Sequence, residues 1–358
     1  MPTRRQARAG MVLAACHRSS GLDSVSPEPD PRSVMLGPTV RHRLYILGAA
    51  VLFSTGGAAI KACALTGWQV AAFRSAVAAL TLLLVLPASR RAWDRRTLLV
   101  GCSYAATLVL FVLANKLTTA ANTIFLQSTA PLYVLLLARV WLGERASRRD
   151  LGFMVLIAAG LALFFIGTEP VRASAPNPWL GNVLAATAGV TWGLTLLGLR
   201  SAGRRTAAGT ADPRGAARGT DADGAPDLGL GAVVVGNIVA CVVCLPFALD
   251  PTLAGTTAAG AATGFGQPRD LLLIAYLGVV QVGLAYVLLT RGFRRVPALE
   301  GSLLILLEPG LNPIWAWLLQ HEVPSTTALL GGAAILGATV ARGVGSNARG
   351  PRTPQTSG

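Results

Sequence analysis

Apolar runs long enough to cross a lipid bilayer recur along most of this chain. A helix needs roughly 20 apolar residues to span the hydrocarbon core, whereas a spanning β-barrel would alternate apolar and polar residues. These runs do not alternate, and charged residues, which make up 13% of the chain, cluster between them. The pattern predicts an all-α integral membrane protein with ten transmembrane helices. The predicted spans lie near residues 44–60, 66–87, 97–115, 117–138, 151–168, 179–199, 229–249, 271–290, 297–319 and 325–341.

Basic residues divide unevenly between the two sides of such a bundle. If the N-terminus is cytoplasmic and the spans alternate, 25 of the 31 Lys and Arg residues lie in cytoplasmic segments and four lie outside, namely Lys61, Lys116, Arg172 and Arg269. Short cytoplasmic loops of membrane proteins carry an excess of Lys and Arg. The sequence therefore predicts a multi-pass protein of the bacterial cytoplasmic membrane with both termini inside. The net charge of +15 arises from these loops, without a basic stripe interleaved with aromatic residues, so no nucleic-acid partner is expected.

Both ends of the chain differ in composition from the spans. Residues 1–43 carry seven Arg and no long apolar run, which predicts a disordered basic extension. Residues 343–358 are predicted to be a disordered tail. The sequence leaves open whether translation starts at Met1 or at Met35.

The predicted spans divide into two sets of five, over residues 44–168 and 179–342. An odd number of spans in each half makes the second half enter the membrane from the opposite side. Two stretches of the second half, 200–228 and 250–270, are rich in Ala, Gly and Thr and are predicted to be variable loops. This arrangement predicts an inverted-topology repeat, which is typical of secondary transporters.

One motif recurs at the same place in both halves. Pro131 precedes Glu144 by thirteen residues in PLYVLLLARVWLGE, and Pro309 precedes Glu322 by thirteen in PGLNPIWAWLLQHE. With inverted halves, Glu144 is expected at the inner surface and Glu322 at the outer one, each in a capping or salt-bridge role.

The stretches around these motifs resemble a known family. AANTIFLQSTAPLYVLLLARVWLGE (120–144) and VPALEGSLLILLEPGLNPIWAWLLQHE (296–322) resemble EamA domains of the drug/metabolite transporter superfamily. VAAFRSAVAAL (70–80) and WGLTLLGLR (192–200) resemble its second and sixth helices. The resemblance runs from about residue 44 to 342 and implies a ten-helix transporter of two EamA domains. One departure is that the closing Gly-Glu of the family reads His-Glu in the second half.

Ionisable residues inside spans are candidates for function, because charge within a bilayer is costly. Glu308 lies mid-span, directly before Pro309, and the apolar surroundings favour its protonated form. Proline removes a backbone donor, so Pro131 and Pro309 are predicted to break their helices and expose carbonyl groups to a cavity. Glu308 is expected either to take part in substrate or proton handling or to make a structural hydrogen bond.

The remaining candidates for substrate binding or coupling also lie in predicted spans. Arg74 can pair with a carboxylate, extend to the interface or bind an anionic substrate group. Neutral polar and aromatic side chains either line a cavity or join helices. The candidates are Arg74, Glu300, Gln127, Gln281, Tyr286, Trp192 and Asn312.

The function predicted is secondary transport of a small metabolite or drug-like solute, with export favoured and proton coupling left open. The partners expected are a small-molecule substrate and the lipid bilayer, and a homodimer is left open. The chain has three His and no HExxH, GxSxG or P-loop motif, so no enzyme, metal or cofactor is expected. A membrane-embedded enzyme, or a scaffold or receptor without transport activity, is the alternative.

Overall fold

The computed structural model describes residues 38–86, 90, 93–142, 148–166, 170–209, 228–250, 267–293, 296, 301 and 304–347. Within these ranges the chain is helical, apart from short connections and an isolated β-bridge between Arg172 and Ala175. The predicted all-α class is therefore confirmed for this part of the chain. The predicted loops at 200–228 and 250–270 and both predicted tails lie largely outside it.

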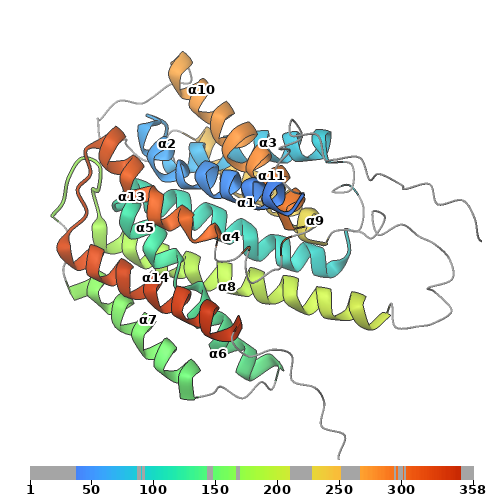
Figure 1. The fold of residues 1–358 in the computed structure, drawn as a ribbon. Helices are drawn as coiled ribbons and strands as arrows, with labels where there is room; N and C mark the ends of the chain where they lie inside the picture. Colours follow the sequence, from blue (N-terminus) through green and yellow to red (C-terminus); the bar gives the residue numbers. More distant parts are fainter. Residues whose placement is uncertain are drawn as a thin grey trace, which may run out of the picture. The chain divides into compact units, whose positions relative to one another are not determined.

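The helices differ widely in length, and α2 and α5 are short whereas α8 is the longest (Figure 1). In chain order they are α1 (Pro38–Ser54), α2 (Gly56–Ala62), α3 (Gly67–Val85), α4 (Arg95–Leu117), α5 (Ala120–Gln127), α6 (Ala130–Leu142), α7 (Arg148–Ile166), α8 (Pro178–Gly209), α9 (Leu228–Leu249), α10 (Pro268–Ala275), the π-helical segment η2 (Tyr276–Leu284), α11 (Ala285–Phe293), α13 (Leu307–Gln320) and α14 (Thr326–Asn347).

Seven helical stretches among the described residues are long and apolar enough to cross a membrane. They are Val40–Ala62, Gly67–Val85, Arg95–Leu117, Ala120–Leu137, Pro178–Leu199, Gly229–Leu249 and Pro268–Gly292. Three predicted spans have no counterpart among the seven. Two correspond to shorter apolar helices, Asp150–Ile166 and Thr326–Ala341, and the third contains α13, which has 14 residues. The count of ten spans therefore stays a prediction.

Two of the long apolar stretches are interrupted helices. A turn at Thr55 separates α1 from α2, and a turn at Ser128 and Thr129 separates α5 from α6. Pro131 is the second residue of α6, and Pro309 is the third residue of α13. Proline is tolerated in the first turn of a helix, because an N–H there would have no partner within the helix. Both prolines therefore follow a break and lie at the start of the next helix.

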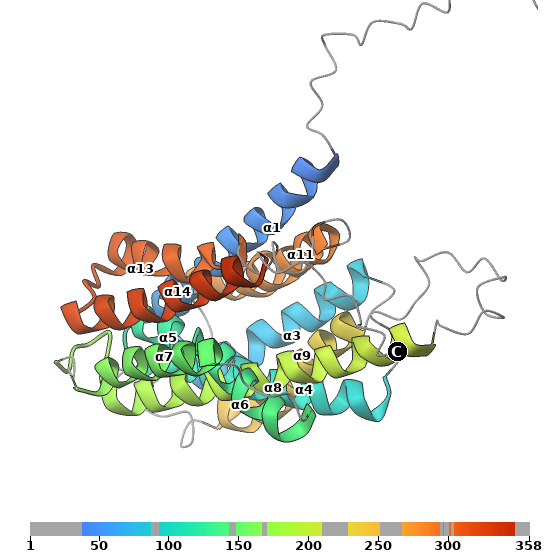
Figure 2. The same ribbon diagram turned by 60° about the horizontal axis from the view of Figure 1, so that its bottom comes forward.

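The principal packing contacts join the N-terminal and C-terminal halves. Helix α4 packs on α8 and α9, α3 on α9 and η2, α1 on α11 and α13, and α7 on α14 (Figure 2). Small residues permit this close approach, as is usual where lipid removes the hydrophobic driving force. A Cβ atom at Gly331 of α14 would lie 2.7 Å from the carbonyl oxygen of Gly160 of α7. The halves therefore interlock along their length.

Candidate functional site

A group of ionisable and aromatic side chains, which we call the central cluster, is brought together from both halves. Its members are Arg74 of α3, Tyr104 of α4, Trp192 of α8, Tyr286 of α11 and Glu308 of α13. The Tyr286 hydroxyl donates a hydrogen bond of 2.8 Å to the Tyr104 hydroxyl. Electrostatic interactions connect both hydroxyls to the Arg74 guanidinium and to the Glu308 carboxyl. Four of the eight predicted candidates therefore share one site.

Arg74 lies deep among the helices of this cluster. Its side chain is 3% exposed, and its Nη2 donates a hydrogen bond of 3.3 Å to the carbonyl oxygen of Leu108. The backbone carbonyl of Arg74 contacts η2, since a Cβ atom at Gly278 would lie 3.0 Å from it. The long side chain thus remains between the helices and does not extend to the membrane surface.

Aromatic rings surround the hydroxyl pair. The rings of Tyr104 and Trp192 have centroids 6.0 Å apart, and those of Phe53 and Tyr286 have centroids 5.2 Å apart in an edge arrangement. Glu308 is half-buried in the first turn of α13. The cluster therefore combines one cation, one carboxyl group and two hydroxyls with apolar walls, which is the composition of a small-molecule site.

Polar side chains of the second half gather around the break between α1 and α2. Gln281 Nε2 donates to the Phe53 carbonyl at 3.4 Å, Trp315 Nε1 donates to the Ser54 hydroxyl at 2.9 Å, and the hydroxyls of Thr55 and Tyr276 lie 2.7 Å apart. The bond from Gln281 satisfies a backbone carbonyl that the interrupted helix would otherwise leave open, and the other two join side-chain hydroxyls beside the break to the second half.

Asn312 and Gln281 are the least satisfied polar residues beside this break. Asn312 is fully buried, and neither atom of its amide has a hydrogen-bond partner among the described residues. The Gln281 side-chain oxygen likewise lacks one. A Cβ atom at Gly57 would lie 3.0 Å from the Asn312 amide, so a larger residue there would press against that amide. Unpaired buried amides next to a broken helix are candidates for contact with a solute.

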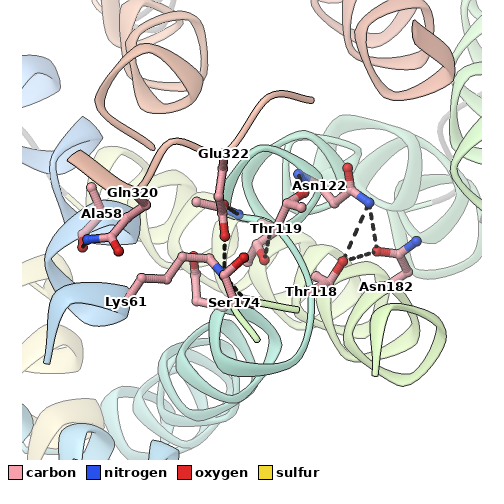
Figure 3. Close-up of polar contacts among 12 residues, drawn as sticks. Ala58, Lys61, Thr118, Thr119, Asn122, Ser174, Asn182, Gln320 and Glu322 are labelled. Atoms are coloured by element: carbon pink, nitrogen blue, oxygen red, sulfur yellow. Dashed lines mark hydrogen bonds and ion pairs between the residues drawn. The ribbon is translucent and has the colours of Figure 1, made fainter. Parts of the chain in front are cut away.

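A second polar network joins the ends of α2, α5 and α13 (Figure 3). Lys61 Nζ lies 2.8 Å from Glu322 Oε1, and the two side chains are 3% and 5% exposed. Glu322 Oε2 also accepts a hydrogen bond of 3.0 Å from the Ala120 backbone N–H at the start of α5. Lys61 donates to the Ser174 carbonyl. The expected salt-bridge and capping roles of Glu322 both occur here, whereas Glu144 lies outside the described residues.

Beside this ion pair, amides and hydroxyls join α5 to α8. The Asn182 side-chain oxygen accepts from the Thr118 hydroxyl at 2.8 Å and from Asn122 Nδ2 at 3.1 Å, and Asn182 Nδ2 donates to the Phe164 carbonyl (Figure 3). His321, which replaces the expected glycine before Glu322, ends α13 with a left-handed φ of 54°. That conformation usually favours glycine, so histidine keeps the same turn here at some strain.

The remaining predicted candidates lie outside these groups or outside the described residues. Gln127 is the last residue of α5, and it is half-buried. Glu300 lies outside the described residues.

Two important residues were missed in the sequence. Tyr104 was not among the candidates, although it lies in an apolar span as Tyr286 does. Lys61 was treated as an external loop residue, although its position beside the Gly-Gly-Ala-Ala stretch of α2 indicates tight packing.

Comparison with known proteins identifies one family. The model of the EamA-like transporter family matches residues 42–166 and 230–341. A solved structure titled only "Crystal structure of protein" superposes with a TM-score of 0.53 at 17% sequence identity, covering 86% of this chain and 98% of that chain, and 25 solved chains match significantly. At this identity the likeness concerns the fold alone. No curated protein sequence matches the chain significantly.

Proposed function

The chain belongs to the EamA-like transporter family, and from that premise we propose that it is a secondary transporter whose small organic solute binds at the central cluster. The observation that carries this proposal is that Arg74 and Glu308, two ionisable residues of different halves, both interact electrostatically with the bonded hydroxyls of Tyr104 and Tyr286. Ionisable side chains inside membrane proteins mark substrate or proton pathways.

The proposed architecture is two inverted five-helix repeats, residues 44–168 and 179–342. The match of one family model to both halves supports a repeat. The contacts also occur in equivalent pairs. The third span of the first half, α4, packs on the first two of the second half, α8 and α9. The third span of the second half, containing η2 and α11, packs on α1 and α3 of the first half.

The proposed orientation has both termini in the cytoplasm of a bacterial cell. Lys61 and Lys116, which the charge pattern assigns to the outside, and Glu322, which the inverted repeat assigns there, lie at one end of the bundle. Lys61 pairs with Glu322, and Lys116 donates to the Cys63 carbonyl at 2.6 Å. This supports the assignment, which labelling of single cysteines at Arg90 and Arg172 from the two sides of the membrane tests. Labelling of both from one side would reject it.

The proposed mechanism is alternating access, in which one half rocks against the other around the central cluster. At the Lys61 end the halves are joined by the buried ion pair with Glu322, so opening there must break that pair. The breaks in α1–α2 and before α13 supply positions where helix segments can tilt separately. Export is the direction we propose, and it is tested by comparing vesicles of the two orientations.

Glu308 is proposed to couple a proton to solute movement. Exchange of a panel of labelled amino acids, sugars and organic acids by proteoliposomes, with and without a pH gradient, tests both transport and coupling. Glu308→Gln is expected to keep solute exchange and to lose accumulation driven by the gradient, because Gln preserves the shape of the acid but binds no proton.

Gly310→Ala is the matched control in the same turn of α13, since a Cβ atom there meets nothing within 4 Å. This variant is expected to behave as the wild type. Full gradient-driven accumulation by Glu308→Gln would remove Glu308 from the mechanism. If no solute in the panel exchanges in any variant, the transport proposal itself fails, and a scaffold or receptor becomes the better explanation.

A further inference from the structure

The charge balance of the central cluster bears on the chemical class of the solute. Arg74 is 3% exposed and carries a guanidinium with five N–H donors. Among the described residues, its hydrogen-bond partner is the neutral carbonyl of Leu108, at 3.3 Å. A backbone carbonyl satisfies a donor but does not neutralise the charge.

No carboxylate within the described part of the chain forms an ion pair with Arg74. The buried ion pair found there, Lys61 with Glu322, belongs to the other network. The groups that interact electrostatically with the guanidinium are the hydroxyls of Tyr104 and Tyr286 and the thiol of Cys244, which carry no charge at neutral pH. An arginine in a span without an anionic partner is costly, so an anion from outside the chain would be bound favourably.

The neighbours of Arg74 can complete an oxyanion site. The Tyr104 hydroxyl accepts its bond from Tyr286, and its own proton therefore remains available for a further acceptor. A solute oxyanion can thus accept from the guanidinium fork and from a phenol. The rings of Trp192 and Phe53, which flank the two tyrosines, offer aromatic walls for an apolar solute body.

The second ionisable group limits the number of charges on the solute. When Glu308 carries a proton, the central cluster has a single positive charge, and one anionic group neutralises it. A dianion would leave a net negative charge between the helices, and a cation would add to the charge of Arg74. Both are disfavoured in a low-dielectric site.

We propose that the solute is an organic monoanion with an aromatic or otherwise apolar body, its oxyanion bound by Arg74 and Tyr104 and its body against Trp192 and Phe53. This inference rests on the proposed function, because it assigns the solute class to the same central cluster.

Three probes that share a phenyl ring and keep their charge at every accessible pH test the inference. They are benzenesulfonate, phenyl glucoside and benzyltrimethylammonium, which are anionic, neutral and cationic. Binding to the full chain in detergent is measured by the rise in melting temperature over a concentration series, and flux by exchange of the labelled probes in proteoliposomes. Benzenesulfonate is expected to bind and exchange best.

Variants of Arg74 separate charge from shape. Arg74→Gln is expected to weaken benzenesulfonate binding by about 30-fold or more, as when one partner of a buried charge pair is lost. Arg74→Lys is expected to retain part of the affinity, because it keeps the charge without the planar fork. If Arg74→Gln does not fold, Arg74→Lys and Tyr104→Phe carry the comparison, and both should weaken binding of the anion alone.

The two proposals fail differently. Best binding of the neutral or cationic probe, binding of none of the three, or unchanged anion affinity in the Arg74 variants would overturn the monoanion inference. Exchange of a cation or a sugar would also overturn the monoanion inference, but it would leave the proposal that the protein is a transporter intact. Arg74-dependent binding of benzenesulfonate without exchange of any solute would instead reject transport and keep the anion site.

Discussion

Removing both charges of the buried pair Lys61 and Glu322 is expected to destabilise the protein less than the two single changes together. Their charged atoms lie 2.8 Å apart, and their side chains are 3% and 5% exposed. Lys61→Met leaves the carboxylate without its cation, and Glu322→Gln leaves the ammonium without its anion. Breaking a buried pair in this way costs about 3–5 kcal/mol of the free energy of unfolding.

The double variant Lys61→Met/Glu322→Gln leaves no unpaired charge. Glutamine keeps an oxygen that can accept from the Ala120 N–H, so that contact, 3.0 Å in the native chain, is retained. The remaining loss is the bond from Lys61 to the Ser174 carbonyl, whose unsatisfied oxygen costs about 1–3 kcal/mol. The double variant is therefore expected to be at least about 2 kcal/mol more stable than the sum of the single effects predicts.

The coupling is measured by denaturant-induced unfolding of the four proteins in lipid–detergent micelles, followed by tryptophan fluorescence. A control cycle combines Lys61→Met with Asp94→Asn. Asp94 caps the N-terminus of α4, whereas Lys61 lies near its C-terminal end, where Lys116 contacts Cys63. Helix α4 has 23 residues and is about 35 Å long, so the effects of these two changes on the free energy of unfolding should add. Single effects of Lys61 and Glu322 that add to within about 0.5 kcal/mol would refute the argument that their charges depend on each other.

Three further outcomes are expected. Gly331→Ala should lower the free energy of unfolding by about 1–3 kcal/mol, because the new Cβ overlaps the opposing helix. Gly337→Ala is the control and should have no such effect, because its Cβ meets nothing within 4 Å. Equal melting temperatures of the two variants would contradict this packing. Tyr104→Phe removes the acceptor of the Tyr286 hydroxyl, so it should lower the free energy of unfolding by about 1–3 kcal/mol and also reduce solute exchange. Solute exchange at the wild-type rate would exclude a binding role for the Tyr104 phenol. Burial raises the pKa of the Cys63 thiol to about 11. The fraction of thiolate, and with it the rate of reaction of Cys63 with a maleimide, should therefore increase only as the pH rises towards that value. Rapid labelling of Cys63 at pH 8 would contradict this and show that the thiol is accessible.

The membrane class, and Arg74 and Glu308 as candidates, were predictable because hydropathy and the cost of intramembrane charge are local properties. A membrane span is recognised from its own composition, and a charged residue within it can be identified without knowing its neighbours in the fold. The same reasoning did not predict where the apolar helices are interrupted or how long each segment is. The break at Thr55 has no proline, and the length of α13 depends on where the preceding turn lies.

The sequence alone thus predicted a helical membrane protein of the EamA-like family, and which polar residues lie within the predicted spans. Only the tertiary structure decided which of them meet. Tyr104 and Tyr286 are 182 positions apart, and a neutral tyrosine in an apolar helix carries no sign of its partner. In the sequence, Lys61 is indistinguishable from a basic residue of an external loop, whereas in the structure helix packing buries it against Glu322. Partner choice depends on how helices from the two halves pack, and that packing is distributed over many weak contacts between small side chains.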